Sequence, residues 1–146
     1  MKRINYLLLG CFFLLTSCNF DSGSNDTKVV DELLVTSSQE LQNLFDTQTS
    51  DVQVTFVGTV EKILADDTEG SQHQKFILKL PTNETLLIVH NIDLAERIDN
   101  LQEGDEIKVF GQYEWNDRGG LIHWTHHDPN RQHIGGWIEH KGKFYE

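Results

Sequence analysis

Two stretches of the chain alternate apolar and polar residues, and each carries a glycine near its centre. Val52–Val60 alternates around Gly58, and Ile107–Trp115 alternates around Gly111. A period of two predicts a strand with one buried face. A glycine inside a strand is typical of a sharp bend or a barrel corner, where a side chain would collide with the neighbouring strand. The pattern therefore favours a small, strongly bent β fold.

Other segments complete the β pattern. Turn sequences at Pro81–Glu84 and Asn116–Gly120 join neighbouring alternating segments, so we expect hairpins at both places. The further strands and the last small hairpin are expected at Gln74–Leu80, Thr85–His90, Leu121–Thr125 and Trp137–Tyr145.

Two helix signals accompany the strands. Ser37–Glu40 has the sequence of a capping box, which predicts a short helix over about Ser38–Thr47. Asp93–Glu96 repeats this pattern, and the apolar residues that follow, up to Leu101, have helical spacing. A second helix of about two turns is therefore predicted between the third and fourth strands.

Three strands, a short helix and two strands is the order of the OB-fold, a five-stranded Greek-key barrel. We expect a mainly β, OB-like barrel with an additional short N-terminal helix, because the inner helix falls where it would close the end of the barrel. The alternative is an open antiparallel sheet with one helix packed on it. Either arrangement makes residues 29–146 a single domain.

The first residues of the chain predict export. A basic start, Met1–Arg3, precedes the apolar run Ile4–Leu15, and this is the pattern of a secretory signal. The run is too short for a permanent transmembrane helix. Leu15–Cys18 resembles a bacterial lipoprotein box, so we expect cleavage of residues 1–17 and a lipid on the Cys18 thiol.

Residues 18–28 are polar and lack apolar periodicity, which predicts a flexible tether between the lipid and the domain. Asn19 follows the lipidated cysteine, and by resemblance to enterobacterial sorting this indicates the outer membrane, facing the periplasm. Cleavage would remove Cys11 and leave no thiol free for a disulfide. The expected partners are the membrane, through the lipid, and an unidentified small ligand or envelope protein.

The chain is acidic, with 12 Lys and Arg against 23 Asp and Glu and a formal net charge of −11. Nucleic-acid binding depends on Lys and Arg that displace counterions from the phosphates. A general DNA- or RNA-binding role is therefore disfavoured.

Seven histidines carry the candidate chemistry. If the second and third strands pair about Thr82 and Asn83, Lys75 lies opposite His90, and His73 lies one pleat beyond. The third and fifth strands are parallel neighbours in an OB barrel, so the fifth strand should bring His126 and His127 near His90.

Along the fifth strand, alternation would put His123, Thr125 and His127 on one face, and Trp124 and His126 on the other. The ligand-binding candidates are His73, Gln74, His90, Asn91, Asp93, Trp124, Arg131 and His133. The catalytic candidates are His126, His127 and Asp128.

Three interpretations stay open for this cluster. His123, His127, His90 and His73 could bind a divalent transition metal such as zinc, since imidazole suits such ions. A histidine beside a carboxylate and an arginine could perform acid–base or nucleophilic chemistry. The cluster could also be a polar surface for a ligand or a protein. We expect a binding or envelope-interaction module rather than an enzyme; the alternative is a metal-assisted hydrolase acting on a phosphoester or a similar exported substrate.

Several uncommon short motifs occur in this sequence in the same order as in a known family. They are Gly70–Phe76, His90–Ala95, Gly111–Asn116, Gly119–Pro129 and Gly136–Ile138. The chain thus resembles a family of small exported bacterial proteins that is catalogued as a domain of unknown function. The resemblance implies an envelope protein of OB-like fold and implies no particular activity.

Overall fold

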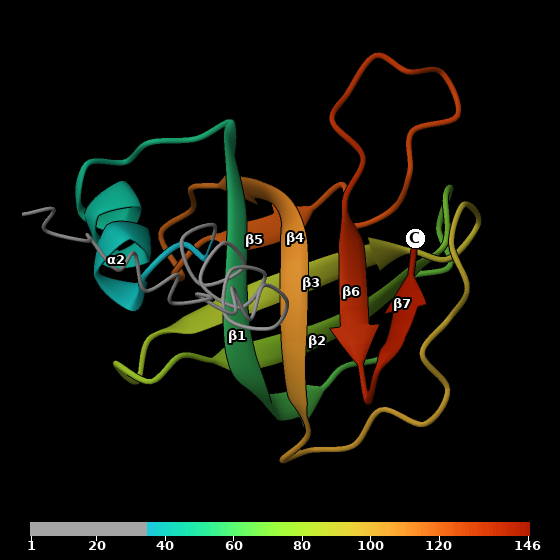
Figure 1. Ribbon diagram of the computed structural model, residues 1–146, viewed down its shortest axis with the longest axis horizontal. Helices are drawn as coiled ribbons and strands as arrows, with labels where there is room; N and C mark the ends of the chain where they lie inside the picture. Colours follow the sequence, from blue (N-terminus) through green and yellow to red (C-terminus); the bar gives the residue numbers. More distant parts are fainter. Residues whose placement is uncertain (1–34) are drawn as a thin grey trace, which may run out of the picture.

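The computed structural model describes residues 35–146, which form a mainly β domain with one helix (Figure 1). The elements in chain order are α2 (Ser38–Asp46), β1 (Val52–Ile63), β2 (His73–Lys79), β3 (Thr85–Asn91), β4 (Glu106–Glu114), β5 (Leu121–His123), β6 (Trp137–His140) and β7 (Lys143–Tyr145). All five predicted barrel strands and the predicted last hairpin are present. The predicted signal peptide 1–17, the lipidation site Cys18 and the tether 18–28 lie outside the described residues.

Five strands close into a barrel in the order β1-β2-β3-β5-β4, and β4 pairs back with β1. β1 reaches both neighbours because Val52–Thr59 pairs with β4 and Thr59–Ile63 pairs with β2. β3 and β5 are parallel, with Leu87 opposite Leu121. This is the predicted OB-like arrangement. The alternative of an open sheet is wrong, because the β1–β4 pairing leaves no open edge between them.

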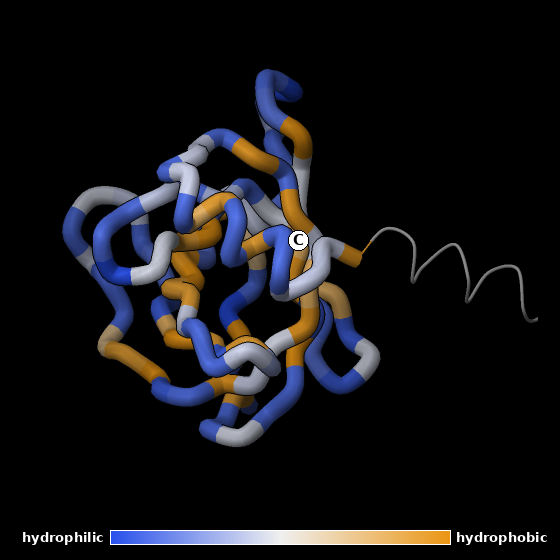
Figure 2. Tube along the Cα trace, turned by 90° about the vertical axis from the view of Figure 1, so that its left-hand side faces the viewer, coloured by the Kyte–Doolittle hydropathy of each residue, from blue (hydrophilic) through white to orange (hydrophobic). Residues whose placement is uncertain are grey.

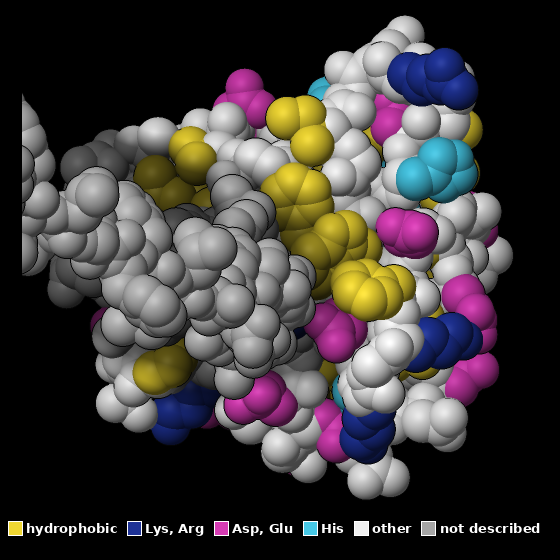
Figure 3. All heavy atoms as spheres, viewed as in Figure 1, with side chains coloured by type: hydrophobic (Ala, Val, Ile, Leu, Met, Phe, Trp, Pro, Cys, Tyr) yellow, Lys and Arg dark blue, Asp and Glu magenta, His cyan; other side chains and the backbone are white. Residues whose placement is uncertain are grey.

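The β6–β7 hairpin extends the sheet beyond the barrel. β6 pairs with Ile107–Phe110 of β4, next to the part of β4, Gln112–Glu114, that pairs with β5. The outer face of this region carries Phe110, Trp137 and Phe144, whose rings follow one another at centroid distances of 5.8 and 5.1 Å. Figure 3 shows hydrophobic side chains gathered over β4 and β6 on this face.

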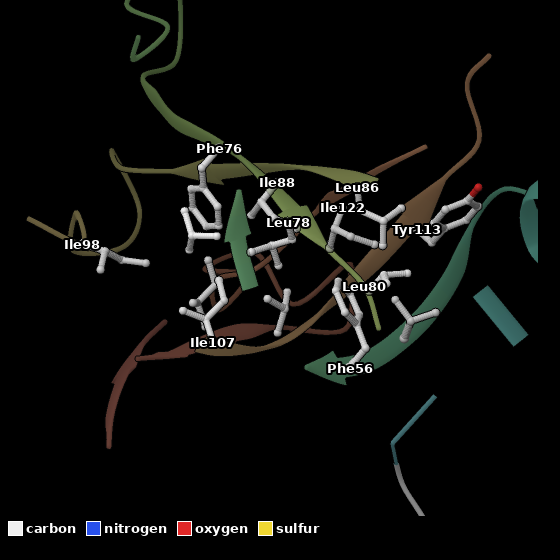
Figure 4. Close-up of a cluster of buried hydrophobic side chains, with 14 of the residues drawn as sticks. Phe56, Phe76, Leu78, Leu80, Leu86, Ile88, Ile98, Ile107, Tyr113 and Ile122 are labelled. Atoms are coloured by element: carbon white, nitrogen blue, oxygen red, sulfur yellow. The ribbon is translucent and has the colours of Figure 1, made fainter. Parts of the chain in front are cut away.

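The core lies inside the barrel and receives one face of each strand. Hydrophobic and hydrophilic residues interchange along the trace in Figure 2, as expected for strands with one buried face. Figure 4 shows the buried side chains meeting from opposite walls. The least exposed of them include Val54, Phe56, Phe76, Leu78, Ile88, Ile107, Val109, Tyr113, Ile122 and Ile138.

α2 begins at the predicted capping box. Ser37 Oγ accepts the Glu40 N–H at 3.2 Å, and Glu40 Oε2 accepts the Ser37 N–H at 2.7 Å. Leu41 is buried against the core, so the apolar side of α2 is packed onto the barrel. No helix among residues 35–146 is long and apolar enough to cross a bilayer.

The helix predicted between β3 and β4 is wrong, because residues 92–105 form turns. Gln74 of β2 donates from Nε2 to the Ile98 carbonyl at 3.0 Å and accepts the Ile98 N–H at 2.9 Å. These two bonds satisfy the backbone groups that a helix would have paired along its own axis. Ile98 and Leu101 are still buried, so they close this end of the barrel without a helix. Figure 4 shows Ile98 at one end of the buried cluster.

Candidate functional site

The β2–β3 register decides which histidines meet, and it differs by one residue from the prediction. Gln74 lies opposite His90, and Lys75 lies opposite Val89. The predicted Lys75–His90 pair is therefore wrong. Neighbouring residues of a strand point to opposite faces. Gln74 and His90 consequently point into the barrel, whereas His73 points outward.

His90 is a structural residue of the barrel interior. Its exposed fraction is 0%. Its Nε2 lies 3.2 Å from the Glu96 carbonyl, and its Nδ1 lies 2.9 Å from Thr125 Oγ1. The carbonyl only accepts, so Nε2 carries the proton and Nδ1 accepts from the Thr125 hydroxyl. Burial lowers the pKa of His90 to about 4, so the ring is neutral and both nitrogens are occupied.

The fifth strand ends earlier than predicted. Trp124 has φ of 51°, in the left-handed region, so β5 stops at His123 and the strict alternation ends there. Thr125 turns inward and is fully buried, His126 is 4% exposed, and His127 is exposed. The predicted face shared by His123, Thr125 and His127 is therefore wrong.

Two glycines allow the backbone of residues 123–125 to pass close to β4. A Cβ on Gly111 of β4 would lie 2.6 Å from the His123 carbonyl oxygen and 2.9 Å from Thr125 Cγ2. A Cβ on Gly136 would collide with the carbonyl oxygens of Trp124 and Phe110. The backbone at Trp124 can thus lie against β4 only because both positions lack side chains. The sequence-based prediction that Gly111 marks a close approach is confirmed.

On the outside of the barrel, residues of β2, of β3 and the turn after it, and of the end of β5 line one hollow of about 210 Å³. β2 contributes His73, β5 contributes His123, and the segment after β5 contributes Trp124 and His126. The remaining lining residues are Val89, Asn91 and Leu94. We call this space the histidine hollow. Of the histidines that were predicted to converge from three segments, His73 and His126 line this hollow, whereas His90 and His127 do not; His123 lines it as well.

Trp124 is the centre of this group of rings. Its indole stacks on His133 with a centroid distance of 4.0 Å and an interplanar angle of 19°. The rings of His126 and His123 lie 5.3 and 6.1 Å away. A bulky residue with positive φ is unusual and persists only where the surroundings hold it. The close packing around Trp124 supplies that restraint.

Glu114 is a site residue that the sequence reasoning missed. Its Oε1 lies 3.6 Å from His123 Nε2. That nitrogen is buried and has no hydrogen-bond partner among the described residues. Gln112 donates to the same Oε1 at 2.7 Å. The β4–β5 hairpin signal pointed to this neighbourhood, but the register that places Glu114 beside His123 depends on the exact number of turn residues.

Burial and hydrogen bonding act against each other in this pair. Burial raises the pKa of Glu114, but hydrogen bonds from Gln112 and Ser50, together with His123, leave that pKa below its usual value. Burial lowers the pKa of His123, and Glu114 offsets only part of this change. An ionised carboxylate therefore faces a predominantly neutral imidazole at neutral pH.

Asp128 organises the loop between β5 and β6. Its carboxylate accepts the backbone N–H groups of Asn130, Gln132 and His133 at 2.8, 2.6 and 2.8 Å. These bonds, that of Asn130 foremost, hold the pKa of Asp128 below its usual value. The carboxylate is thus committed to the loop that projects from the barrel in Figure 1. Asp128 itself is buried, and the exposed candidates on that loop are His127, Arg131 and His133.

Asp93 has a similar local role, since its Oδ2 accepts the Gln72 N–H at 2.7 Å. Asn91 lines the histidine hollow, and its Oδ1 accepts the Asp93 N–H at 2.9 Å. Asn91 therefore keeps its amide N–H groups available while its carbonyl oxygen is fixed.

The four predicted metal ligands are not brought together. His90 is inside the barrel, His127 is on the loop, and only His73 and His123 line the hollow. Among residues 35–146, no group of three or more His, Cys, Asp or Glu is arranged to hold a metal ion. The predicted zinc set thus has no geometric basis in the described part of the chain.

A search of curated protein sequences finds no match for this chain. A family profile matches residues 27–146, which cover the whole described domain. The resemblance noted in the sequence is thereby confirmed. The chain belongs to the family described as protein of unknown function DUF3465.

Proposed function

We propose that the domain is a binding module whose ligand occupies the histidine hollow. The observation that carries this proposal is the convergence of His73 from β2, Asn91 from β3, and the consecutive residues His123 and Trp124 at the end of β5 on one outward hollow. OB-like barrels commonly bind ligands on the outer face of their second and third strands. The hollow lies on that face, beside His73 of β2 and Asn91 of β3.

The chemistry of the lining favours an uncharged, polar ligand with an apolar part. Within the described residues, no Lys, Arg, Asp or Glu lines the hollow. Imidazole and amide groups supply hydrogen bonds, and Trp124, Val89 and Leu94 supply apolar contact. A ligand with a strong charge would lose water there without gaining an opposite charge.

Trp124 provides a direct test. The chain has three tryptophans, so a protein with Trp115→Phe and Trp137→Phe emits only from Trp124. We expect an uncharged ring compound, screened from sugars, amides and aromatic alcohols, to change this emission saturably. His123→Ala should weaken that binding about tenfold, the effect of one or two lost neutral hydrogen bonds.

His127→Ala is the matched control, because His127 lies on the projecting loop and is exposed. It should leave the affinity unchanged. Saturable binding that leaves Trp124 emission unaffected, or that survives His123→Ala at full strength, would place the ligand elsewhere and overturn the proposal.

The second part of the proposal is the location. We infer that the module is a lipoprotein of the cell envelope, held at Cys18 and facing the periplasm from the outer membrane. The basic start, the apolar run and the box Leu15–Cys18 support this. Cys18→Ser should abolish incorporation of labelled palmitate and release the protein from membranes, whereas Cys11→Ser should retain both. Labelling that persists in Cys18→Ser would contradict the assignment.

A further inference from the structure

We propose that the histidine hollow is also a hydrolytic site, in which His123 accepts a proton from water and Glu114 positions the His123 ring. The substrate class is an uncharged acyl ester. This inference rests on the hollow proposed above as the binding site, and it adds an activity to it.

The geometry of the pair is that of an oriented base. Glu114 Oε1 lies 3.6 Å from His123 Nε2, and catalytic hydrogen bonds are often long in the absence of substrate. Gln112 fixes the carboxylate from one side at 2.7 Å. The Nε2 atom is buried and has no other partner in residues 35–146, so its proton faces the carboxylate. His123 also lines the hollow, which leaves Nδ1 as the nitrogen that accepts a proton there.

The protonation states agree with these roles. The lowered pKa of His123 keeps the ring neutral, and the lowered pKa of Glu114 keeps the carboxylate ionised. An ionised carboxylate beside the Nε2–H holds one tautomer and stabilises the imidazolium that forms during proton transfer. Glu114 is thus a positioning residue, and His123 is the group that meets the reacting water.

The lining selects the substrate class and the nucleophile. Within the described residues, no Ser, Thr or Cys lines the hollow, so water is the nucleophile. No Lys or Arg lines it either, so a phosphoester would lack a partner for its charge. Val89 and Leu94 offer an apolar contact for an acyl chain, and Leu94 is 40% exposed. An uncharged carboxylic ester fits this chemistry.

Asn91 supplies a donor for the ester carbonyl. Its Oδ1 accepts the Asp93 N–H at 2.9 Å, which turns the amide nitrogen away from that turn and leaves its two N–H groups available. A fixed donor aimed at a developing oxyanion is among the strongest contributions to acyl transfer.

Hydrolysis proceeds in two steps. The water oxygen bonds to the ester carbonyl carbon, its proton passes to His123 Nδ1, and the carbonyl electron pair moves to the oxygen held by Asn91. The carbonyl then forms again, the bond between carbon and the alcohol oxygen breaks, and Nδ1 returns the proton to that oxygen. The products are a carboxylic acid and an alcohol.

The experiment uses the purified lipid-bearing protein in detergent, with p-nitrophenyl acetate and butyrate as probes. We expect saturable release of p-nitrophenol, and we expect His123→Gln to lower kcat/KM about 100-fold. Glu114→Gln should lower it about tenfold and shift the acid limb of the pH–rate profile to lower pH, because Glu114 raises the pKa of His123. His127→Gln should match the wild type, and bis(p-nitrophenyl) phosphate should not be hydrolysed.

Two results would overturn the inference. The first is a kcat/KM for His123→Gln within about twofold of that for His127→Gln. Other imidazoles on the surface would then account for the hydrolysis. An acyl group on His123 in the mass spectrum would show attack by the ring rather than by water. In the protein with Trp115→Phe and Trp137→Phe, saturable quenching of Trp124 emission by p-nitrophenol reports binding separately. Quenching without hydrolysis rejects only the hydrolytic step, and absence of both rejects the binding site as well.

Discussion

The two faces of the wall formed by β2, β3 and β5 carry the same kinds of polar side chain in opposite settings. On the inside, His90 is 0% exposed and both of its ring nitrogens have partners. On the outside, the His123 side chain is 35% exposed and its buried Nε2 has no hydrogen bond among the described residues. The inner histidine supports the fold, whereas the outer one has capacity left for a ligand.

The comparison shows why a count of histidines says little about a site. Gln74 and His73 are neighbours in sequence, yet the first locks the Ile98 backbone inside the barrel and the second lines the outer hollow. A buried polar group must be paired, since an unpaired one costs about 1–3 kcal/mol. A polar side chain whose hydrogen-bonding groups all have partners has a structural role. One that lines a hollow with a group left unpaired is a candidate site residue.

The largest effect on stability should come from disrupting the close approach of residues 123–125 to β4. Gly111→Ala should lower the free energy of unfolding by roughly 4 kcal/mol, because its Cβ would meet the His123 carbonyl at 2.6 Å and backbone cannot move aside easily. Gly58→Ala is the control, since its nearest atom lies at 3.3 Å. Urea titrations compare the two. Equal losses in both variants would show that this close approach is not specially constrained.

The inner face should also make stability depend on pH. The pKa of His90 falls from an ordinary value of 6.5 to about 4 on folding, so the unfolded chain binds the proton more strongly. The contribution of the neutral His90 ring to the free energy of unfolding is complete above pH 6.5 and is lost as the pH falls towards 4. The total loss is about 3 kcal/mol, at about 1.4 kcal/mol per pKa unit.

Urea unfolding between pH 7 and pH 4 measures this loss. His90→Gln should flatten the dependence, and His127→Gln should preserve it. A smaller contribution of the same sign comes from His123, whose pKa is also lowered. An unchanged pH dependence in His90→Gln would mean that histidines of the outer face, not His90, cause the loss of stability.

Gln74→Leu should cost about 2 kcal/mol, since it keeps the side-chain volume but leaves the Ile98 N–H and carbonyl without partners. Thermal unfolding measures the loss, and amide hydrogen exchange at Ile98 should accelerate. Lys75→Leu on the opposite face of β2 serves as the control. Protection at Ile98 that persists in Gln74→Leu would mean that a helical bond takes over there.

The smallest effect on stability is expected for the outer face. His123→Gln should change the free energy of unfolding by less than about 0.5 kcal/mol, because the side chain is partly exposed and makes no short hydrogen bond. Thermal unfolding at pH 7.5 checks this. A loss as large as that of Gln74→Leu would make His123 a structural residue like His90.

Much of the fold followed from local patterns. Alternation around Gly58 and Gly111 predicted β1 and β4, and the capping box at Ser37 predicted the start of α2. These features depend on neighbours within a few residues, so the sequence contains the information directly. The order of the elements then implied the barrel.

The arrangement of the candidate site depended on tertiary structure. The β2–β3 turn is closed between Leu80 and Glu84, which centres it on Thr82 and moves the register by one residue. Such a shift exchanges the two faces of a strand, and it sent Gln74 and His90 inward. The segment that follows β3 does not form the predicted helix, because the inward Gln74 side chain binds the Ile98 backbone.

Local sequence patterns were thus enough to predict the strands, the helix α2, the barrel order and the family. Which polar residues share a face follows from the strand pairing of the folded barrel, because a one-residue difference in register reverses that assignment. The close approach of residues 123–125 to Gly111 and Gly136 accompanies the end of β5, and the β4–β5 register places His123 beside Glu114. That pairing joins residues from two strands through the shape of the barrel, and no local pattern in either strand specifies it.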